Sequence, residues 1–465
     1  MADSEARPAA PPQRRDLTTG PIAKTLLLFA LPTLGANVLQ SLNGSINAIW
    51  VGNFLGEAAL AATSNANIVM FLMFAAVFGL AMATTILIGQ AMGRRDVNMA
   101  RRTLGSSIGL IGALGIVVAA IGWLTAPALL RVLATPPAAM PFAIAYTRVI
   151  FAGLPFTFLT VLLTSALRGA GDSVTPLRAM ILNVALDAGL NPFLIRGIGP
   201  FPKLGIAGSA LATLIAGLIT LVFLLTYIYR KDLVVRLRGS ELRYLRLDRT
   251  IAKSIFVKGL PMGIQMIVLS FGMLTMIGLV NRAGVDTTAA YGAISQLWGY
   301  VQMPALAVGA AVSAMAAQNI GAGRWDRVER VAWSGAGINL LMTGAMVLLI
   351  TIVDRPLLGL FLTPNSPAVP IGQHIHLLAS WSFLLFGVSM VLMSVMRANG
   401  AVVAPLVILI VAMFPGRLGF AFGLMPVLGT DALWWAFPAG SVASFAMTLS
   451  YFRWGGWRKA RMLDA

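Results

Sequence analysis

The stretch SALRGAGDSVTPL at residues 165–177 recurs as SVMRANGAVVAPL at residues 394–406, so the two copies lie 229 residues apart. They match at six of thirteen positions, namely at Ser, Arg, Gly, Val, Pro and Leu. Two more landmarks repeat at nearly the same offset: Leu31-Pro32 recurs as Leu260-Pro261, and GQAMG from Gly89 recurs as AQNIG from Ala317. A unit of this length is too long for a solenoid repeat. We therefore expect the chain to consist of two related halves.

The composition places both halves in a membrane. The 465 residues are 58% hydrophobic and 11% charged, whereas soluble domains carry about 25% charged residues. This contrast excludes a soluble globular enzyme, and it excludes a disordered chain, which would be polar. The sequence has no cysteine and only two histidines. Disulfides and thiolate chemistry are therefore excluded, and a metal site built on either residue type is not expected.

Twelve apolar stretches are each long enough to cross about 30 Å of hydrocarbon as a helix, which takes roughly 20 residues. Their continuous apolar character excludes a β-barrel, because barrel strands alternate apolar and polar residues. We therefore expect an all-α integral membrane protein with twelve transmembrane helices in two pseudo-symmetric six-helix lobes. The expected spans are 24–50, 59–89, 103–125, 141–166, 174–195, 205–229, 251–280, 288–317, 331–353, 372–396, 401–422 and 432–452.

The basic residues predict the orientation. With both termini in the cytoplasm, 27 of the 34 Lys and Arg residues fall in inside segments, as the positive-inside rule requires. Topology thus explains the net charge of +18, and we expect no nucleic-acid partner. The first tail lacks the apolar middle of a signal peptide. The expected parts are cytoplasmic tails at 1–20 and 454–465, lobes at 21–229 and 251–453, and a basic cytoplasmic linker at 230–250.

The even number of spans in each half predicts how the lobes are related. Both halves enter the membrane from the same side, so they are expected to be parallel repeats about an axis along the membrane normal. Two such lobes suit alternating access, in which they rock around a site near the midplane. We expect a monomer in a bacterial-type inner (plasma) membrane, in contact with lipid.

Asp187 is the acid that the sequence places in the middle of a span, within NVALDAGLNP. An acid there costs roughly 2.5–3.5 kcal/mol on insertion scales, which indicates a function. Asn183 and Asn191 stand four residues before and after it, so all three share one helical stripe. Such a group can bind a proton, or coordinate a hard cation such as Na⁺ through its oxygens. The alternative is a structural acid that hydrogen-bonds a neighbouring helix.

The first span carries four amide side chains: Asn37, Gln40, Asn43 and Asn47. Asn43 and Asn47 share a face, and we assign them to the ion site. Asn37 and Gln40 are weaker candidates for lining a substrate cleft. The alternative for all four is that amides join helices within lipid.

The second half carries no counterpart of this polar set. At offset 229, the positions of Asn43, Asn47, Asn183 and Asp187 are occupied by Gly272, Met276, Ala412 and Gly416. We therefore expect the ion site in the first half only. Arg148 and Arg417 fall near the ends of expected spans, where such side chains snorkel to the interface. The sequence carries no metalloprotease, serine-hydrolase or P-loop motif, so neither an enzyme nor ATP coupling is expected.

Several stretches resemble the multidrug and toxic compound extrusion (MATE) family, over nearly the whole chain. They are LPTLGANVLQSLNGSINAIWVGNFLGEAALAA, GQAMGRRD, LRGAGDSVTPL, and NVALD followed by GIGPFPKLGIAGSALAT. The resemblance implies twelve helices in two lobes and export of organic cations and drugs against inward proton or sodium flow.

Within that family, NVALD is most similar to the DinF-like branch, whose fifth helix carries an acid implicated in coupling. Asp187 matches that acid, and Asn183 matches an amide beside it. Two acids of the family are absent. Asn47 stands where a first-helix acid is usual, and the seventh-helix acid of the NorM-like branch is missing. Coupling is thus expected to depend on Asp187 alone.

The expected function is a cation-coupled antiporter for multidrug efflux and xenobiotic transport. It exports amphipathic or cationic compounds by alternating access, needs no cofactor, and uses H⁺ or Na⁺ as the coupling ion. One alternative is a flippase for a lipid-linked or anionic precursor, whose cleft would need several Arg or Lys residues. The others are a passive channel and a membrane-embedded enzyme.

Overall fold

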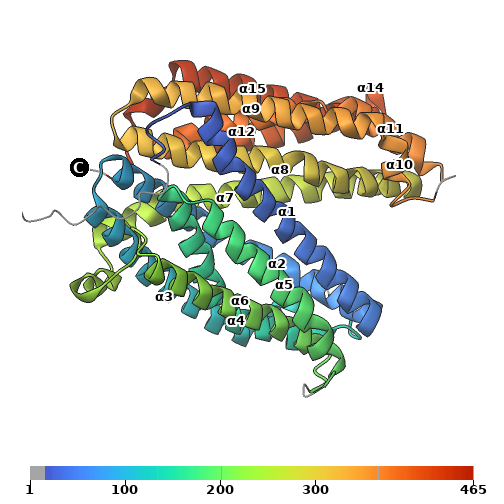
Figure 1. Cartoon of the computed structure of the whole chain (residues 1–465). Helices are drawn as coiled ribbons and strands as arrows, with labels where there is room; N and C mark the ends of the chain where they lie inside the picture. Colours follow the sequence, from blue (N-terminus) through green and yellow to red (C-terminus); the bar gives the residue numbers. More distant parts are fainter. Residues whose placement is uncertain (1–15, 134, 200–201, 364–365, 464–465) are drawn as a thin grey trace, which may run out of the picture.

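Long apolar helices make up both halves of the chain in the computed structural model, which describes residues 16–133, 135–199, 202–363 and 366–463. Figure 1 shows the helices as two bundles that lie together at one end and diverge toward the other. The first bundle contains α1 (Ile22–Leu55), α2 (Glu57–Gly93), α3 (Val97–Val132), α4 (Met140–Gly169), α5 (Val174–Arg196) and α6 (Ile206–Arg230). The predicted all-helical fold in two lobes is confirmed.

The second bundle follows a short linker helix, η1 (Gly239–Leu245). Its long helices are α7 (Arg249–Val280), α8 (Val285–Gly321), α9 (Trp325–Ile352) and α15 (Asp431–Trp454). Its shorter elements are η2 (Asn281–Ala283), α10 (Asp354–Leu358), α11 (Ala368–Ala379), α12 (Ser382–Ala398), α13 (Val403–Val411), the π-helix η3 (Ala412–Gly419), α14 (Phe420–Leu428) and η4 (Gly456–Lys459).

By length and composition, ten helical segments in the described residues can cross a membrane, and an eleventh span is made by α11 and α12 together. Helix α5 accounts for the remaining predicted span. It has 23 residues, which is long enough to cross, but its polar residues lower its hydropathy. It packs against α1 and α6.

Two spans of the second lobe are less regular than the sequence suggested. The tenth is bent by 46° between α11 and α12. In the eleventh, α13 and α14 are joined by η3, which contains Pro415. Proline lacks a backbone N–H and cannot join the regular helical ladder, and π-helical turns inside helices occur frequently at functional sites.

The repeated stretches form equivalent turns in the two lobes. Residues 165–177 connect α4 to α5, and residues 394–406 connect α12 to α13. Gly171 and Gly400 occupy the same place in these turns, with φ of 91° and 97°. Only glycine takes up such angles without strain, which explains why this residue is common to both copies.

Helices α2 and α8 bring the two lobes together, and they do so by equivalent contacts. Gln90 of α2 donates to the carbonyl oxygen of Ala398 at 2.8 Å, and Gln318 of α8 donates to that of Gly169 at 3.0 Å. Each glutamine therefore reaches the helix end of the opposite lobe. A Cβ atom at Gly93 would collide with the carbonyl of Gln318, and one at Gly321 with the carbonyl of Gln90. We call this region the closed end.

Segments outside the bundles also converge on the closed end. Leu17 is buried, its N–H donates to Gln318 Oε1 at 3.2 Å, and Asn319 donates to its carbonyl at 3.1 Å. The linker is held on α3 by Arg101, which pairs with Glu241 at 2.6 Å. Burial works to raise the pKa of Glu241, but the Arg238 N–H and Arg101 outweigh it and hold that pKa below its usual value. The pair therefore stays charged at neutral pH.

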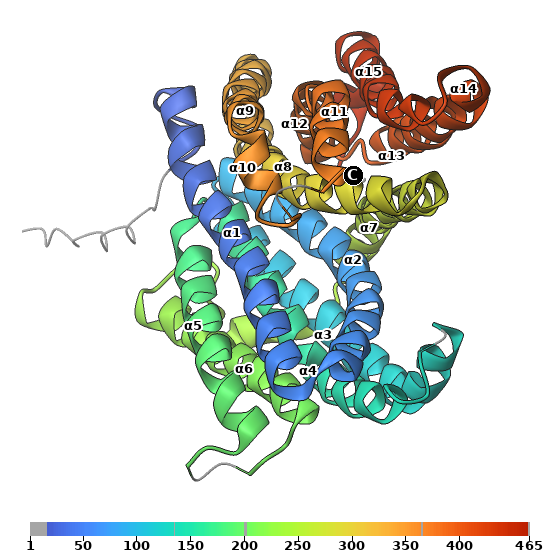
Figure 2. The same cartoon turned by 90° about the vertical axis from the view of Figure 1, so that its right-hand side faces the viewer.

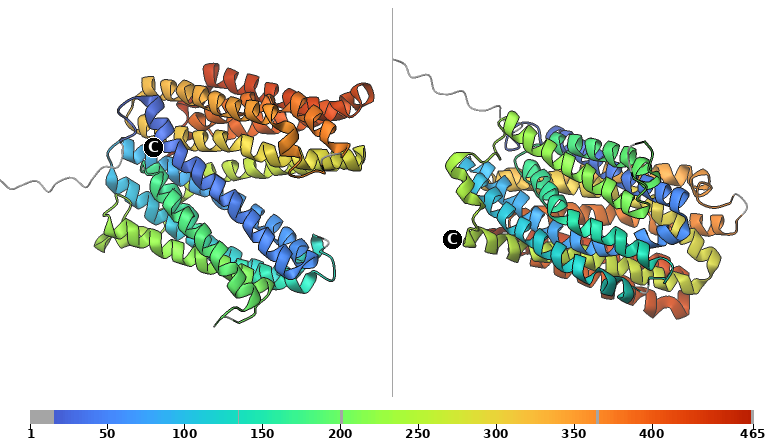
Figure 3. Two further views of the ribbon diagram at one scale, coloured as in Figure 1. Left: turned by 45° about the vertical axis from the view of Figure 1, so that its right-hand side comes forward. Right: turned by 90° about the horizontal axis from the view of Figure 1, so that it is seen from below.

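Helix α1 also contacts both lobes. It packs against α8 and α9 as well as against α5 and α6. In Figures 1 and 2 it begins beside α9 and runs obliquely along the first lobe toward the far end. The left view in Figure 3 shows the same divergence of the lobes. A displacement within α1 would therefore be transmitted from one lobe to the other.

We predict that alanine at Gly93 or Gly321 weakens the closed end. The added methyl group meets backbone on the opposite helix, and such overpacking costs about 1–3 kcal/mol. Thermal unfolding of the detergent-solubilised protein measures the effect. Gly217→Ala on α6, where a Cβ meets nothing within 4 Å, is the control and should leave the Tm unchanged or raise it. Equal Tm values for all three variants would show that the glycines are not needed for close approach.

Candidate functional site

Asp187 lies near the middle of α5 with its side chain 1% exposed. Three side chains donate to its carboxylate. Asn43 of α1 donates to Oδ2 at 2.8 Å, while Thr213 of α6 and Asn191 of α5 donate to Oδ1 at 3.0 and 3.2 Å. No lysine or arginine among the described residues pairs with it. The carboxylate thus joins three helices while keeping its charge uncompensated.

Two amide oxygens beside the carboxylate lack partners. The Oδ1 atoms of Asn43 and Asn191 are buried and accept no hydrogen bond from another described residue. Unsatisfied buried acceptors are costly and usually have a functional reason. A proton on the carboxyl group, or a cation next to it, would supply the missing partner. Carboxylate and amide oxygens are also the ligands that hard cations prefer.

A second set of hydrogen bonds continues from this centre. Thr213 also donates to the carbonyl of Ser209 at 3.3 Å, and the Ser209 hydroxyl donates to Asn47 Oδ1 at 2.7 Å. The side chains of Asn47 and Tyr146 hydrogen-bond each other. The network therefore runs from Asp187 through α6 to α1 and α4. Asn47 belongs to this network but does not itself hydrogen-bond the carboxylate.

The other predicted residues lie outside this network. Asn183 is half-buried one turn before Asp187, and none of the hydrogen bonds to the carboxylate comes from it. Asn37 is half-buried and Gln40 is exposed. Neither hydrogen-bonds a described residue of the network. Of the seven predicted residues, the structure brings together Asp187, Asn191, Asn43 and Asn47.

Three members of the network were not predicted from sequence: Ser209, Thr213 and Tyr146. A signal exists for the first two, because Ser209 and Thr213 are hydroxyl residues four apart in an apolar helix and so share one face. Tyr146 has no comparable signal. It lies in the apolar sequence of α4, and only the packing of α4 beside α6 brings it to Asn47.

The equivalent positions in the second lobe are packed with apolar groups. Met276 and Ala412 are buried, and a Cβ at Gly272 would collide with Met413. The expectation that Arg417 lies near a span end is wrong. The span runs Val403–Leu428, and the π-helical segment between α13 and α14 places Arg417 in its middle.

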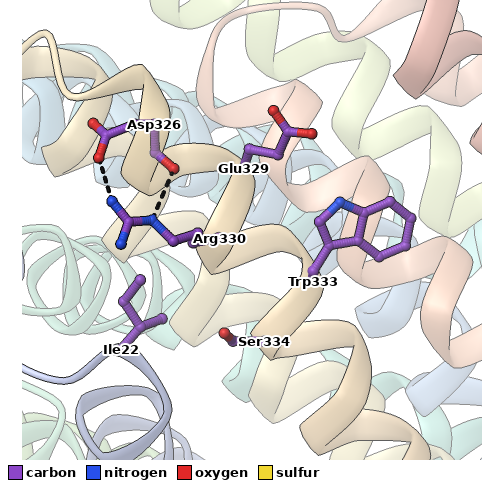
Figure 4. Close-up of a pocket in the computed structure, with 6 residues that line it drawn as sticks. All are labelled: Ile22, Asp326, Glu329, Arg330, Trp333 and Ser334. Carbon is purple, nitrogen blue, oxygen red and sulfur yellow. Dashed lines mark hydrogen bonds and ion pairs between the residues drawn. The ribbon is translucent and has the colours of Figure 1, made fainter.

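A recess of about 570 Å³ lies at the start of α1 and α9, and Figure 4 shows the residues that line it. It is lined by Ile22, Asp326, Glu329, Arg330, Trp333 and Ser334. Its one basic residue, Arg330, already pairs with Asp326. The recess shares no residue with the network. Among the described residues, no group of three or more acids and histidines is placed to hold a metal ion.

Comparison with known proteins gives matches over almost the whole chain. The family model described as MatE matches residues 32–193 and 261–422, two segments separated by the 229-residue offset of the repeat. The probable multidrug resistance protein YoeA of Bacillus subtilis (strain 168) is 34% identical over 441 residues, which cover 94% of this chain and 95% of that protein.

Two further matches agree with this one. The probable multidrug resistance protein YpnP of the same strain is 29% identical over 448 residues, covering 96% of this chain and 98% of that protein. A crystal structure of a MATE protein in complex with MaD3S has a TM-score of 0.88 at 22% identity. It covers 97% of this chain and 100% of its own. At that identity the structural match supports the fold.

We predict that Asn43 and Asp187 are energetically coupled. Removing the Asn43 amide leaves a buried carboxylate without one of its donors, which costs about 1–3 kcal/mol. A double-mutant cycle of Asn43→Ala and Asp187→Asn, followed by thermal unfolding, should give a non-additive term of about 0.5–3 kcal/mol. Asn37→Ala on the same helix is the control and should be additive with Asp187→Asn. Additivity of the Asn43 pair would contradict the contact.

Proposed function

Because the chain belongs to the MatE family of multidrug efflux transporters, we propose that it exports amphipathic and cationic compounds in exchange for an inward-moving H⁺ or Na⁺. Members of this family are transporters rather than enzymes, and they carry small molecules across the membrane. The coupling ion, the substrate class and the residues that bind the ion are our proposals. The observation that carries them is the buried carboxylate of Asp187, which three helices hold without a basic partner among the described residues.

In this proposal, Asp187 is the binding site for the coupling cation. In its charged form it accepts three hydrogen bonds and draws α1, α5 and α6 together. Binding of a proton or Na⁺ removes the net charge, and the donors of Asn43 and Thr213 lose their charged acceptor. Hydrogen bonds to charged groups contribute about 1.5–3 kcal/mol, so neutralisation changes the free-energy difference between two positions of α1 by a comparable amount.

Helix α1 connects that change to the lobes. Its hydrogen bond to Asp187 lies on the first lobe, while it also packs against α8 and α9 of the second. The positive-inside rule places the closed end in the cytoplasm, with both chain ends there. In the arrangement shown in Figure 1, the lobes then meet at the cytoplasmic end and diverge toward the outside. Cation binding favours the opposite arrangement, in which the closed end opens to admit a substrate.

A flippase and a passive channel are the rival functions. A flippase would scramble or translocate labelled lipid without an ion gradient. A channel would let substrate equilibrate but not accumulate. Gradient-driven accumulation in vesicles separates both from an antiporter.

We predict that Asp187→Asn impairs ion-driven transport. In proteoliposomes with imposed pH and sodium gradients, applied separately, the wild-type protein should accumulate ethidium under one of them. The variant should do so about tenfold more slowly or worse, since a charged hydrogen-bonding group is lost. Asp286→Asn makes the same chemical change at an exposed acid in the first turn of α8 and should transport normally. Undiminished transport by Asp187→Asn would rule out the coupling role.

We also predict that locking the closed end stops transport. The chain has no cysteine, so a pair introduced at Gly89 and Ala317 is the only one present. A Cβ at Gly89 would lie 2.9 Å from the Cβ of Ala317, somewhat closer than the roughly 3.8 Å usual in a disulfide, so a small shift allows the bond. Oxidation of the double variant should stop transport and reduction should restore it, while either single variant should not respond. Full activity of the cross-linked protein would contradict alternating access at this end.

A further inference from the structure

Arg417 lies next to the position in the second lobe that corresponds to Asp187 in the first. At the 229-residue offset Arg417 corresponds to residue 188, directly after Asp187. Both lie near the middle of the fifth span of their lobe. A charged residue inside a span is costly and by default indicates a functional site. Each lobe therefore carries a charged residue near the middle of its fifth span, an acid in the first lobe and a base in the second.

The Arg417 guanidinium lies over one ring of a buried aromatic cluster. Its Cζ atom lies 3.4 Å from the centroid of the Phe437 ring on α15. Phe437 in turn contacts Trp298 of α8 at 4.8 Å between centroids, and Tyr291 of α8 stacks on Trp434 of α15 at 5.9 Å. These four rings are buried in the apolar core of the second lobe. Arg417 therefore points into the lobe rather than to the membrane interface.

No anionic partner in the described chain balances this charge. The Nε atom of Arg417 is buried without a hydrogen-bond acceptor, and the ion pairs among the described residues involve other basic side chains. The face of Phe437 compensates only part of the cost, because a cation–π contact is weaker than a hydrogen-bonded ion pair. Trp298, by contrast, has its indole N–H satisfied by Ser380 at 2.6 Å. Within this cluster, Arg417 is therefore the side chain whose charge has no partner among the described residues.

The backbone at this point is adapted to hold the side chain. Arg417 lies in the π-helix η3, between Pro415 and the start of α14. An ordinary α-helix would turn the side chain by a different angle, and π-helical turns are found frequently at functional sites. A residue with only a packing role would not need this interruption.

We propose that Arg417, which packs on Phe437, forms a second substrate subsite, which binds an oxyanion carried by an organic substrate. This inference rests on the proposed function, because it names a substrate class for that transporter. A guanidinium presents a planar fork of donors that pairs with a carboxylate, sulfonate or phosphate by two hydrogen bonds.

The subsite extends the substrate range beyond cations. One lobe carries an acid and the other a base, so a zwitterionic compound finds a partner for each of its charges. An anionic compound uses Arg417 alone. A compound that is only cationic gains nothing from Arg417, and this difference makes the inference testable with a matched pair of ligands.

Rhodamine 110 and rhodamine 123 form such a pair, since they share one ring system and rhodamine 123 is the methyl ester of the rhodamine 110 carboxylate. Binding of each dye to the full-length protein in lipid nanodiscs is measured by fluorescence anisotropy. The wild-type protein should bind rhodamine 110 more tightly. Arg417→Gln should weaken rhodamine 110 binding about tenfold or more, as expected for loss of a charged hydrogen-bonded pair, and should leave rhodamine 123 binding within about twofold.

Arg417→Lys is a second variant for the case in which the neutral variant misfolds. It keeps the positive charge but loses the planar fork of donors. It should bind rhodamine 110 with intermediate affinity. Equal weakening of both dyes by Arg417→Gln, or no effect on either, would overturn the inference, as would equal affinity of the wild-type protein for the two dyes. Asp187→Asn should keep the preference for rhodamine 110. Ion-driven transport of rhodamine 123 by the wild-type protein tests the proposed function separately, because its failure leaves the dye comparison unaffected.

Discussion

The account depends on the hydrogen bond between Asn43 and Asp187, which ties α1 to α5 across the interior of the first lobe. Thr213 and Asn191 also donate to this carboxylate, and their hydrogen bonds offset part of the cost of burying it. Its charge has no counter-ion in the described chain, so the free energy of this junction depends on whether a cation is bound. Helix α1 carries that dependence to α8 and α9, on which it also packs.

The two halves of the repeat make equivalent contacts at the closed end, but they differ around Asp187 and Arg417. Gln90 and Gln318 make equivalent hydrogen bonds to the opposite lobe, and Gly93 and Gly321 allow equivalent close approaches. Alternating access needs two similar lobes that meet and separate as units. It does not need two similar binding sites. The polar residues around Asp187 have apolar counterparts in the second lobe, and an arginine follows the position equivalent to the acid. The two lobes therefore share their helix arrangement but differ in the side chains at this level.

Much of the fold could be predicted from the sequence, because bilayer thickness fixes span length and the repeat fixes the two lobes. The same reasoning found Asp187, since an acid in an apolar run is conspicuous, and Asn43, since it shares a polar face with Asn47. It could not find Tyr146, whose place in the network follows from helix packing rather than from spacing. It also misplaced Arg417, because it ended the span at residue 422, whereas the apolar segment continues to Leu428. The coupling roles of Asp187, Asn183, Asn191, Asn43 and Asn47 stay predictions.

Infrared difference spectroscopy of the protein in nanodiscs tests the central claim most directly, because comparison with the Asp187→Asn variant isolates the band of one carboxyl group. Spectra are compared between acidic and alkaline buffer, and between sodium and a large inert cation, for the wild-type protein and Asp187→Asn. The account predicts a carboxyl or carboxylate band that changes with pH or with sodium in the wild-type protein and is missing in the variant. Identical difference spectra for the two proteins would show that Asp187 does not exchange a cation.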